Sequence, residues 1–394
     1  MAQSGGNQSL VTYSDYWKPF RPGVQSNSSV VLYRELRVTS KLMKAKVELK
    51  TELQTKMSPI LRRMQSAVFL ALLTLIVGAS PLAQAESCQT SDDMDPTNKA
   101  AITAVGLRYF GFLTKADAAS LKQNAIDSLA RDFGGVENTI KAHTAELTGA
   151  QAMARPAFLL EADGPPPKPH SEFYCGVFGK SGQTAGSAIF YLDNLPPGKY
   201  AVIILDGTSS GGKTISSMIL QQSGTDWKLG GLFVKSAQVS GHDSDWYVQQ
   251  ARAYKTKGQL HNAWFYYMEA RSLISPLPFM STLVSDKLYD ESESLQPADM
   301  PGDKKTVDLP SAGAIYKVSA VFPEAVGTDL DLIVKYQAAD VSNTNAAYQG
   351  NVAVMKAFIA KFPETREAFA GVVARAVDPS GRDYGTMLAM KDIK

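Results

Sequence analysis

The sequence is poor in the residues that build metal and thiol chemistry. Its 394 residues include two cysteines and four histidines, and they contain no C-x-x-C pair and no mixed Cys/His zinc pattern. Dithiol redox sites and the common zinc folds are therefore excluded. In an oxidising compartment Cys88 and Cys175 can form a single disulfide. Two free thiols are the alternative, because spacing alone does not show that the Cα atoms come within bridging distance.

A large surplus of charge is also lacking. The formal net charge is +2, and residues 1–66 hold eleven Lys/Arg against four Asp/Glu. The remaining 328 residues hold 29 basic and 34 acidic residues, so the body of the chain is mildly acidic. Such a body lacks the basic surface that binds phosphate backbones, and we expect no nucleic-acid partner. The hydrophobic share of 44% predicts packed cores, and the length allows two or three domains.

No apolar run reaches the roughly 20 residues of a membrane span. The longest is the 13-residue run Ala67–Ala79, which follows Arg62 and Arg63 and precedes Ala83-Gln84-Ala85. A basic start, a short apolar core and an A-x-A site are typical of a secretory signal peptide. We therefore assign residues 57–85 to a signal peptide, with an uncleaved signal anchor as the alternative.

Cleavage after Ala85 would leave a mature chain that starts at Glu86 and has no stable membrane span. We expect this chain to be exported to the periplasm or the extracellular space. Residues 1–56 are then an N-terminal extension or a mis-assigned gene start, with Met57 or Met64 as a suitable initiator. The sequence leaves open whether they are translated, and we assign them no function.

A literal phosphate-loop pattern occurs in the middle of the chain. Residues 207–214 match G-x-x-x-x-G-K-[ST], with Gly207, Gly212, Lys213 and Thr214 as candidate cofactor-binding residues. A phosphate loop must open a helix, but only eight or nine residues follow before the turn-forming Ser223–Asp226. We therefore predict a glycine-rich turn between antiparallel strands and no nucleotide cofactor. Under the alternative, ATP would bind and Lys213→Ala would abolish that binding.

Helical patterns precede strand patterns in the first half of the mature chain. Residues 96–147 show helical periodicity, and strand-like runs separated by turn residues follow. The expected strands are 157–161, 173–178, 187–192, 200–206, 214–221 and 228–235. This order predicts an α+β domain at 86–240, with helices packed in a curved antiparallel sheet.

The last of these strands has a recognisable form. Trp227, Lys228, Leu229, Gly231, Phe233, Val234 and Lys235 fit W-[KR]-[LV]-x-G-x-[FY]-[VI]-K. With Pro197–Val202 as the earlier strand entry, residues 97–237 resemble the nuclear-transport-factor-2-like, or cystatin-like cone, superfamily in its exported bacterial branch. The resemblance implies a cone whose open end holds a pocket, used for catalysis in some members and for binding in others. Catalytic members place Asp, His or Tyr inside the cone, and the predicted strands here carry no Asp/His pair.

A helical hairpin is expected at 241–284. Small and aromatic residues stand at the spacings of a tetratricopeptide repeat: Tyr247, Ala251, Tyr254, Gly258, Ala263, Tyr267 and Ala270. A single copy cannot bury both faces, so we predict a hairpin packed on the cone, with a peptide-binding array as the alternative. One face of the aromatic group Trp264–Tyr267 must look outward, either covering the C-terminal domain or meeting a partner.

The C-terminal part divides into a linker and a small domain. Mixed charge and several prolines predict a linker at 285–310. Residues 311–394 are expected to form a β-β-α-β domain. Its elements are strands at 314–322 and 330–336, a helix at 345–362, a second helical run at 364–377 and a closing strand at 383–390.

One polar cluster is a candidate metal or acid/base site. His242, Asp243 and Asp245 lie together before the hairpin, and His with two Asp can bind a divalent metal. The alternative is that Ser244 or Asp245 caps the following helix, with His242 in its lead-in. We favour the cap and expect no metal.

These patterns favour an exported binding or scaffold protein of a bacterial envelope, which is not an enzyme. Its partner would be a small apolar ligand or another envelope protein, neither of which the sequence identifies. A cone-superfamily enzyme of the isomerase, dehydratase or hydrolase kind, acting on a small apolar substrate, is the alternative. Nucleotide binding at 207–214 is a third hypothesis.

Overall fold

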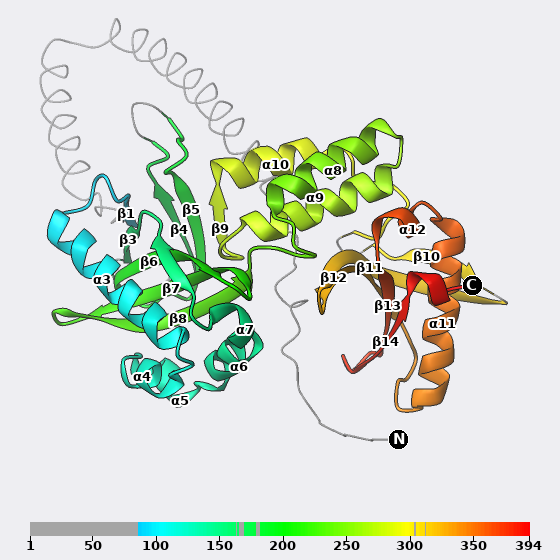
Figure 1. The fold of residues 1–394 in the computed structure, drawn as a ribbon, viewed down its shortest axis with the longest axis horizontal. Helices are drawn as coiled ribbons and strands as arrows, with labels where there is room; N and C mark the ends of the chain where they lie inside the picture. Colours follow the sequence, from blue (N-terminus) through cyan, green and yellow to red (C-terminus); the bar gives the residue numbers. More distant parts are fainter. Residues whose placement is uncertain (1–85, 163, 165–168, 179–181, 303–304, 312) are drawn as a thin grey trace, which may run out of the picture. The chain divides into compact units, whose positions relative to one another are not determined.

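The structure is a computed structural model that describes residues 86–162, 164, 169–178, 182–302, 305–311 and 313–394. They belong to one compact unit, Ala85–Lys394. The predicted signal peptide and the segment before it lie outside the described residues. Within the described part of the chain, no helix is both long enough and apolar enough to cross a membrane. The fold of the described residues is α+β, as predicted, and holds three sheets (Figure 1).

The first sheet has six strands and is built around a long antiparallel meander. Its strands are β1 (Ser87–Gln89), β2 (Gln151–Ala154), β3 (Phe158–Ala162), β6 (Gly198–Ser209), β7 (Gly212–Ser223) and β8 (Asp226–Ser236). The order is β1-β3-β6-β7-β8, and β2 pairs with β6. The three predicted strands at 200–206, 214–221 and 228–235 are confirmed as β6, β7 and β8, which are longer than expected.

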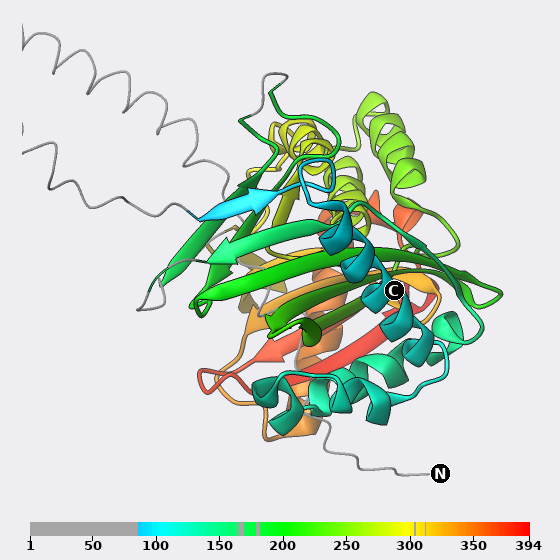
Figure 2. The ribbon, with the colours of Figure 1, turned by 90° about the vertical axis from the view of Figure 1, so that its left-hand side faces the viewer.

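Five helices belong to this sheet, and they cover one of its faces (cyan and teal in Figure 2). They are α3 (Pro96–Leu113), α4 (Ala118–Gln123), α5 (Asp127–Arg131), α6 (Gly134–Ala142) and α7 (Thr144–Leu147). The Asp95 side chain caps α3 by accepting from the amide of Thr97, and Pro96 occupies the first turn. Buried Tyr109, Phe110 and Leu113 of α3 pack against the apolar side chains of β6 and β7.

A second, three-stranded sheet packs on the opposite face. It consists of β4 (His170–Cys175), β5 (Ala188–Asp193) and β9 (Met280–Thr282) in the order β4-β5-β9 (Figure 1). The prediction that the strands at 173–178 and 187–192 belong to the main meander is therefore wrong. β5 pairs instead with β9, about 90 residues further along the chain, which no local pattern indicates. A Cys88–Cys175 disulfide joins β1 of the first sheet to β4 of the second.

The helical hairpin consists of α8 (Ser244–Thr256) and α9 (Leu260–Ile274), which pack along each other as predicted. A further helix, α10 (Leu283–Glu293), begins where a linker was predicted, so that prediction is wrong over 285–293. A capping box formed by Thr282 and Ser285 starts this helix, and Leu288 buries its apolar side.

The third sheet is mixed, with five strands in the order β10-β11-β12-β13-β14. Its elements are β10 (Val307–Ser311), β11 (Ala314–Val326), β12 (Asp329–Gln337), α11 (Thr344–Lys361), α12 (Thr365–Ala368), β13 (Gly371–Val377), β14 (Asp383–Ala389) and the 3-10 turn η3 (Met390–Asp392). The helix predicted over 364–377 is present only as α12, and the prediction is wrong over 371–377, where β13 runs parallel to β12. Val372, Ala374 and Ala376 are buried at a period of two, as in a strand.

Candidate functional site

The phosphate-loop pattern lies on a β-hairpin. Ser209 pairs with Gly212, Thr208 with Lys213 and Gly207 with Thr214, so the pattern spans the end of β6, a tight turn and the start of β7. β7 pairs with β6 on one side and β8 on the other, and its amides bond to those neighbours. The residue after Thr214 continues a strand and opens no helix, so the anion-binding helix terminus of a phosphate loop is missing here.

This geometry gives a direct prediction for Lys213, whose side chain is exposed. We expect Lys213→Ala to change the free energy of unfolding by less than about 0.5 kcal/mol. We also expect calorimetry with magnesium ATP to give no binding heat for either the parent chain or the variant. A saturable heat in the parent chain that the variant loses would restore the nucleotide hypothesis.

The polar cluster before the hairpin caps a helix. Asp243 is the N-cap of α8, and its side chain accepts from the Trp246 amide at 3.2 Å. The expected caps Ser244 and Asp245 are therefore wrong by one or two positions, although the capping role is right. His242 stacks on Trp246, with 3.7 Å between the ring centroids and 7° between the planes. No set of three metal-binding side chains lies together among the described residues.

The helix-covered face of the six-stranded sheet is almost wholly apolar. Its lining from β6, β7 and β8 includes Leu205, Met218 and Val234, and Phe110 approaches from α3. Two fully buried polar residues interrupt it, Thr214 and Ser216, which are 1% and 0% exposed. Their hydroxyl groups have no hydrogen-bond partner. Ser236, the cross-strand neighbour of Thr214 on β8, donates from its hydroxyl to the Glu146 carboxylate of α7. Thr214 starts the strand predicted at 214–221, but its burial inside the layer was not predicted from the sequence.

A buried pair of titratable residues lies on the other side of the same strands. Because Val234 faces the helices, its neighbour Lys235 points the opposite way. The Lys235 ammonium group donates to the carbonyl oxygen of Ser275 at 2.6 Å and to that of Ser272. These are carbonyls at the C-terminal end of α9, where a cation also meets the negative end of the helix dipole.

The second residue of this pair is Glu269, which lies on α9 about one turn before Ser272. It is 4% exposed, and burial raises the pKa of its carboxyl group to about 7, with Lys235 opposing the shift and Glu324 adding to it. Burial likewise lowers the pKa of Lys235 to about 8. Perturbed residues of this kind mark functional sites or structural ion pairs, and the bonds to the end of α9 favour the structural role. In the sequence, the signal that pointed to Glu269 was an acidic residue close to the aromatic residues that α9 buries.

The aromatic group on α9 covers the C-terminal layer. Phe265 and Tyr266 lie edge-on to Phe369, with 5.8 Å between ring centroids in both pairs. The Tyr266 hydroxyl donates to the carbonyl oxygen of Ala368 at 2.7 Å. The sequence left open whether this aromatic group covers the C-terminal domain or meets a partner. These contacts show that it covers the C-terminal domain.

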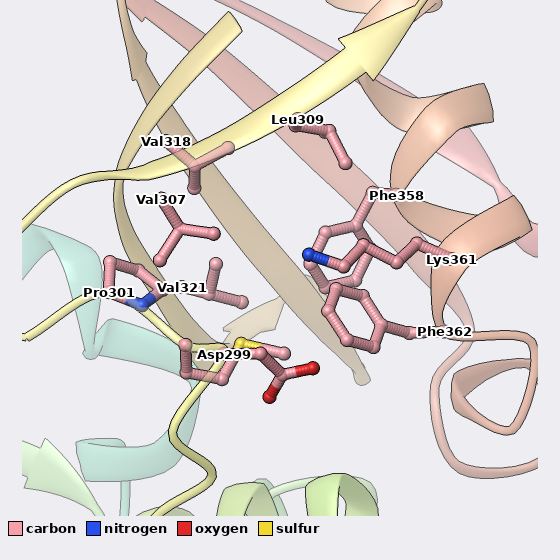
Figure 3. Close-up of a pocket in the computed structure, with 10 residues that line it drawn as sticks. Asp299, Pro301, Val307, Leu309, Val318, Val321, Phe358, Lys361 and Phe362 are labelled. Atoms are coloured by element: carbon pink, nitrogen blue, oxygen red, sulfur yellow. The ribbon is translucent and has the colours of Figure 1, made fainter.

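A shallow apolar pocket lies between the third sheet and α11. Val307, Val318 and Val321 line one side and Phe358 and Phe362 the other (Figure 3). Asp299 and Lys361 are its charged lining residues. It is far smaller than the 300–1,000 Å³ typical of ligand pockets, so we assign it no binding role.

Comparisons of this chain with protein-family models, with curated proteins and with solved structures found no match.

Proposed function

We propose that this chain is an exported binding or scaffold protein of a bacterial envelope. One observation carries the proposal: the fully buried part of the helix-covered face of the six-stranded sheet is lined by apolar side chains and the hydroxyl groups of Thr214 and Ser216. A cone-type enzyme would place its acid or base on that face. An apolar lining with a few polar groups is instead typical of small-molecule binding sites.

We further propose that the six-stranded sheet and α3 form a cone of the nuclear-transport-factor-2-like kind. Support comes from the tryptophan-led strand that carried the resemblance. Trp227 is 5% exposed, and its carbonyl oxygen accepts from the Tyr109 hydroxyl at 3.0 Å. The last strand of the meander is therefore tied to the helix that it curves around.

Two features support export. The leader pattern at 57–85 is one, and the Cys88–Cys175 disulfide is the other, because disulfides persist in oxidising compartments. A small apolar ligand would suit the lining of the sheet, and an envelope protein remains the other candidate partner.

The alternative is a cone enzyme acting on a small apolar substrate. The buried lysine and glutamate with shifted pKa values, Lys235 and Glu269, lie on the side of the sheet away from α3. They could not serve a reaction in the cone interior. A binding role therefore accounts better than catalysis for an interior without these two ionisable side chains.

Expression of the full chain in a bacterial host tests this proposal. We expect a processed product that starts at Glu86 in the periplasmic fraction and shows no turnover of small esters, enones or hydroxy acids. Retention in the cytoplasm would contradict export. Turnover that is lost on changing a side chain of the helix-covered face would favour the enzyme.

A further inference from the structure

The third sheet ends in a strand whose outer edge is open. β14 runs over seven residues without proline, and within the described residues it pairs only with β13. The amide of Asp378 donates to the carbonyl oxygen of Arg382 just before β14, and bonded pairs alternate along an antiparallel ladder. The backbone groups of every second residue of β14 therefore point away from β13. These residues are Asp383, Gly385, Met387 and Ala389.

The other edges of the described sheets are short or covered. β1, β2 and β9 have three or four residues each, and β10 contains Pro310. On β8, Leu229 bonds through its backbone to the segment 124–126. On β4, the amide of Glu172 donates to the Glu86 side chain. Proteins protect edge strands in such ways against pairing with other chains, and β14 lacks this protection.

Two side-chain positions on β14 are unusual for an exposed strand. Glycine weakens a strand, and it often marks a place where another backbone approaches closely. A Cβ atom at Gly385 would meet nothing closer than the Cγ atom of Arg375 at 3.6 Å, which is an ordinary contact. Met387 lies two residues further on the same side of the sheet, and it is 49% exposed. The packing of one chain explains neither residue.

A second copy of β14 fits this edge in one register. When two β14 strands pair antiparallel about a twofold axis at Thr386, all seven residues overlap and the outward-pointing backbone groups meet each other. Met387 of each copy then lies beside Gly385 of the other, where the missing side chain leaves room for it. Asp383 at the start of one strand comes near Lys391, which follows the end of the other.

The helix above this edge carries another exposed apolar group. Asn351 of α11 donates to the carbonyl oxygen of Tyr384 on β14 at 3.0 Å. A Cβ atom at Gly350 would lie 2.8 Å from the Tyr336 hydroxyl oxygen, so Gly350 faces β12. Tyr348 is about 200° from Gly350 around the helix and therefore lies on the side beyond β14. It is 39% exposed, and a strand added to the edge would cover it.

We propose that this chain forms a homodimer by antiparallel pairing of β14 with β14 of a second copy. The third sheets of the two copies then join into one continuous sheet. The open backbone groups supply the hydrogen bonds, and Met387 and Tyr348 supply apolar contact. The partner is a second copy because the residues of this edge complement one another in the symmetric register. The dimer goes beyond the proposed binding function and does not depend on it.

Sedimentation velocity of the purified full chain over a range of concentrations tests the dimer. We expect a reversible monomer–dimer equilibrium that Met387→Lys weakens by about tenfold or more, because the lysine loses hydration where the strands meet. Ile315→Lys is the matched control on β11, where Ile315 is 66% exposed, and it should keep the parent affinity. The melting temperatures of the two variant monomers should equal that of the parent monomer. A parent chain that stays monomeric up to about 0.1 mM, or equal affinity in both variants, would overturn the dimer.

Disulfide crosslinking tests the register. Both native cysteines are bonded to each other, so an introduced cysteine supplies the free thiol. At the axis the two Thr386 residues form a non-bonded pair with Cα atoms about 4.5 Å apart, within disulfide range. Thr386→Cys should form a covalent dimer on mild oxidation, whereas Asp383→Cys, with its copies about 20 Å apart, should not. No covalent dimer from Thr386→Cys, or equal yields from both variants, would overturn the pairing of β14 with its copy.

Discussion

Reduction of the disulfide between Cys88 and Cys175 should lower the free energy of unfolding by about 4 kcal/mol. The bond closes a loop with a sequence separation of 87 residues, and a crosslink of that length removes much entropy from the unfolded chain. It also ties the three-residue strand β1, which pairs only with β3 in its own sheet, to β4. Urea titration with and without a thiol reductant measures the difference.

A variant with both cysteines changed to alanine is the control for this experiment. It should be as unstable as the reduced parent chain, apart from the small core loss at Cys175, which is fully buried. The reductant should leave it unchanged. A change below about 1 kcal/mol on reducing the parent chain would show that the unfolded chain gains little freedom when the bond is cut.

Glu269 should make the protein less stable at pH 8 than at pH 5. Burial raises the pKa of its carboxyl group from 4.5 to about 7 in the folded chain. Below pH 4.5 the group is protonated in both states and costs nothing. As the pH rises to 7, the unfolded chain gains from ionisation and the folded chain does not. The stability lost across this window is about 3 kcal/mol.

Lys235 shifts stability in the adjacent window. The pKa of its ammonium group is lowered from 10.5 to about 8, so its cost is fully present below pH 8 and declines as the pH rises toward 10.5. Together the two groups place a stability minimum between pH 7 and 8.

Urea titrations between pH 4 and 10 test the contribution of Glu269. Glu269→Gln should remove most of the loss between pH 4.5 and 7, whereas Glu137→Gln, at an exposed position on α6, should keep it. Parallel pH profiles for the parent chain and Glu269→Gln would show that the carboxyl group is hydrated in the folded state.

The parts of the fold that follow from local patterns could be predicted from the sequence. β6, β7 and β8 were found because turn residues separate their apolar runs, and the four turn residues Ser223–Asp226 indicated hairpin spacing. The same reasoning identified the phosphate-loop match as a hairpin, because the residues after Lys213 favour a strand. The hairpin of α8 and α9 followed from small and aromatic residues at helical intervals.

The errors arose where pairing is non-local. β9 has three residues and pairs with a strand far earlier in the chain, so no periodicity marks it. β13 was taken for a helix because alanine and valine at 371–377 suit either structure, and its parallel pairing with β12 decides the matter. α10 was missed because its charged and serine residues resemble a linker, although Thr282 and Ser285 formed a readable capping box.

The candidate site shows the same limit. No spacing rule connects Lys235 with Glu269, since the strand and the helix meet only in the folded chain. Ser216 is one of many serines, and only its burial without a partner makes it notable. Thr214 was singled out for the wrong reason, as a phosphate-loop residue, because the pattern of a glycine-rich hairpin coincides with that of a nucleotide site.

N-terminal sequencing of the product that a bacterial host makes from the full chain is the most direct test of the account. We predict that the product starts at Glu86 and is found in the periplasmic fraction. A product that keeps residues 57–85 and stays in the cytoplasm would contradict export.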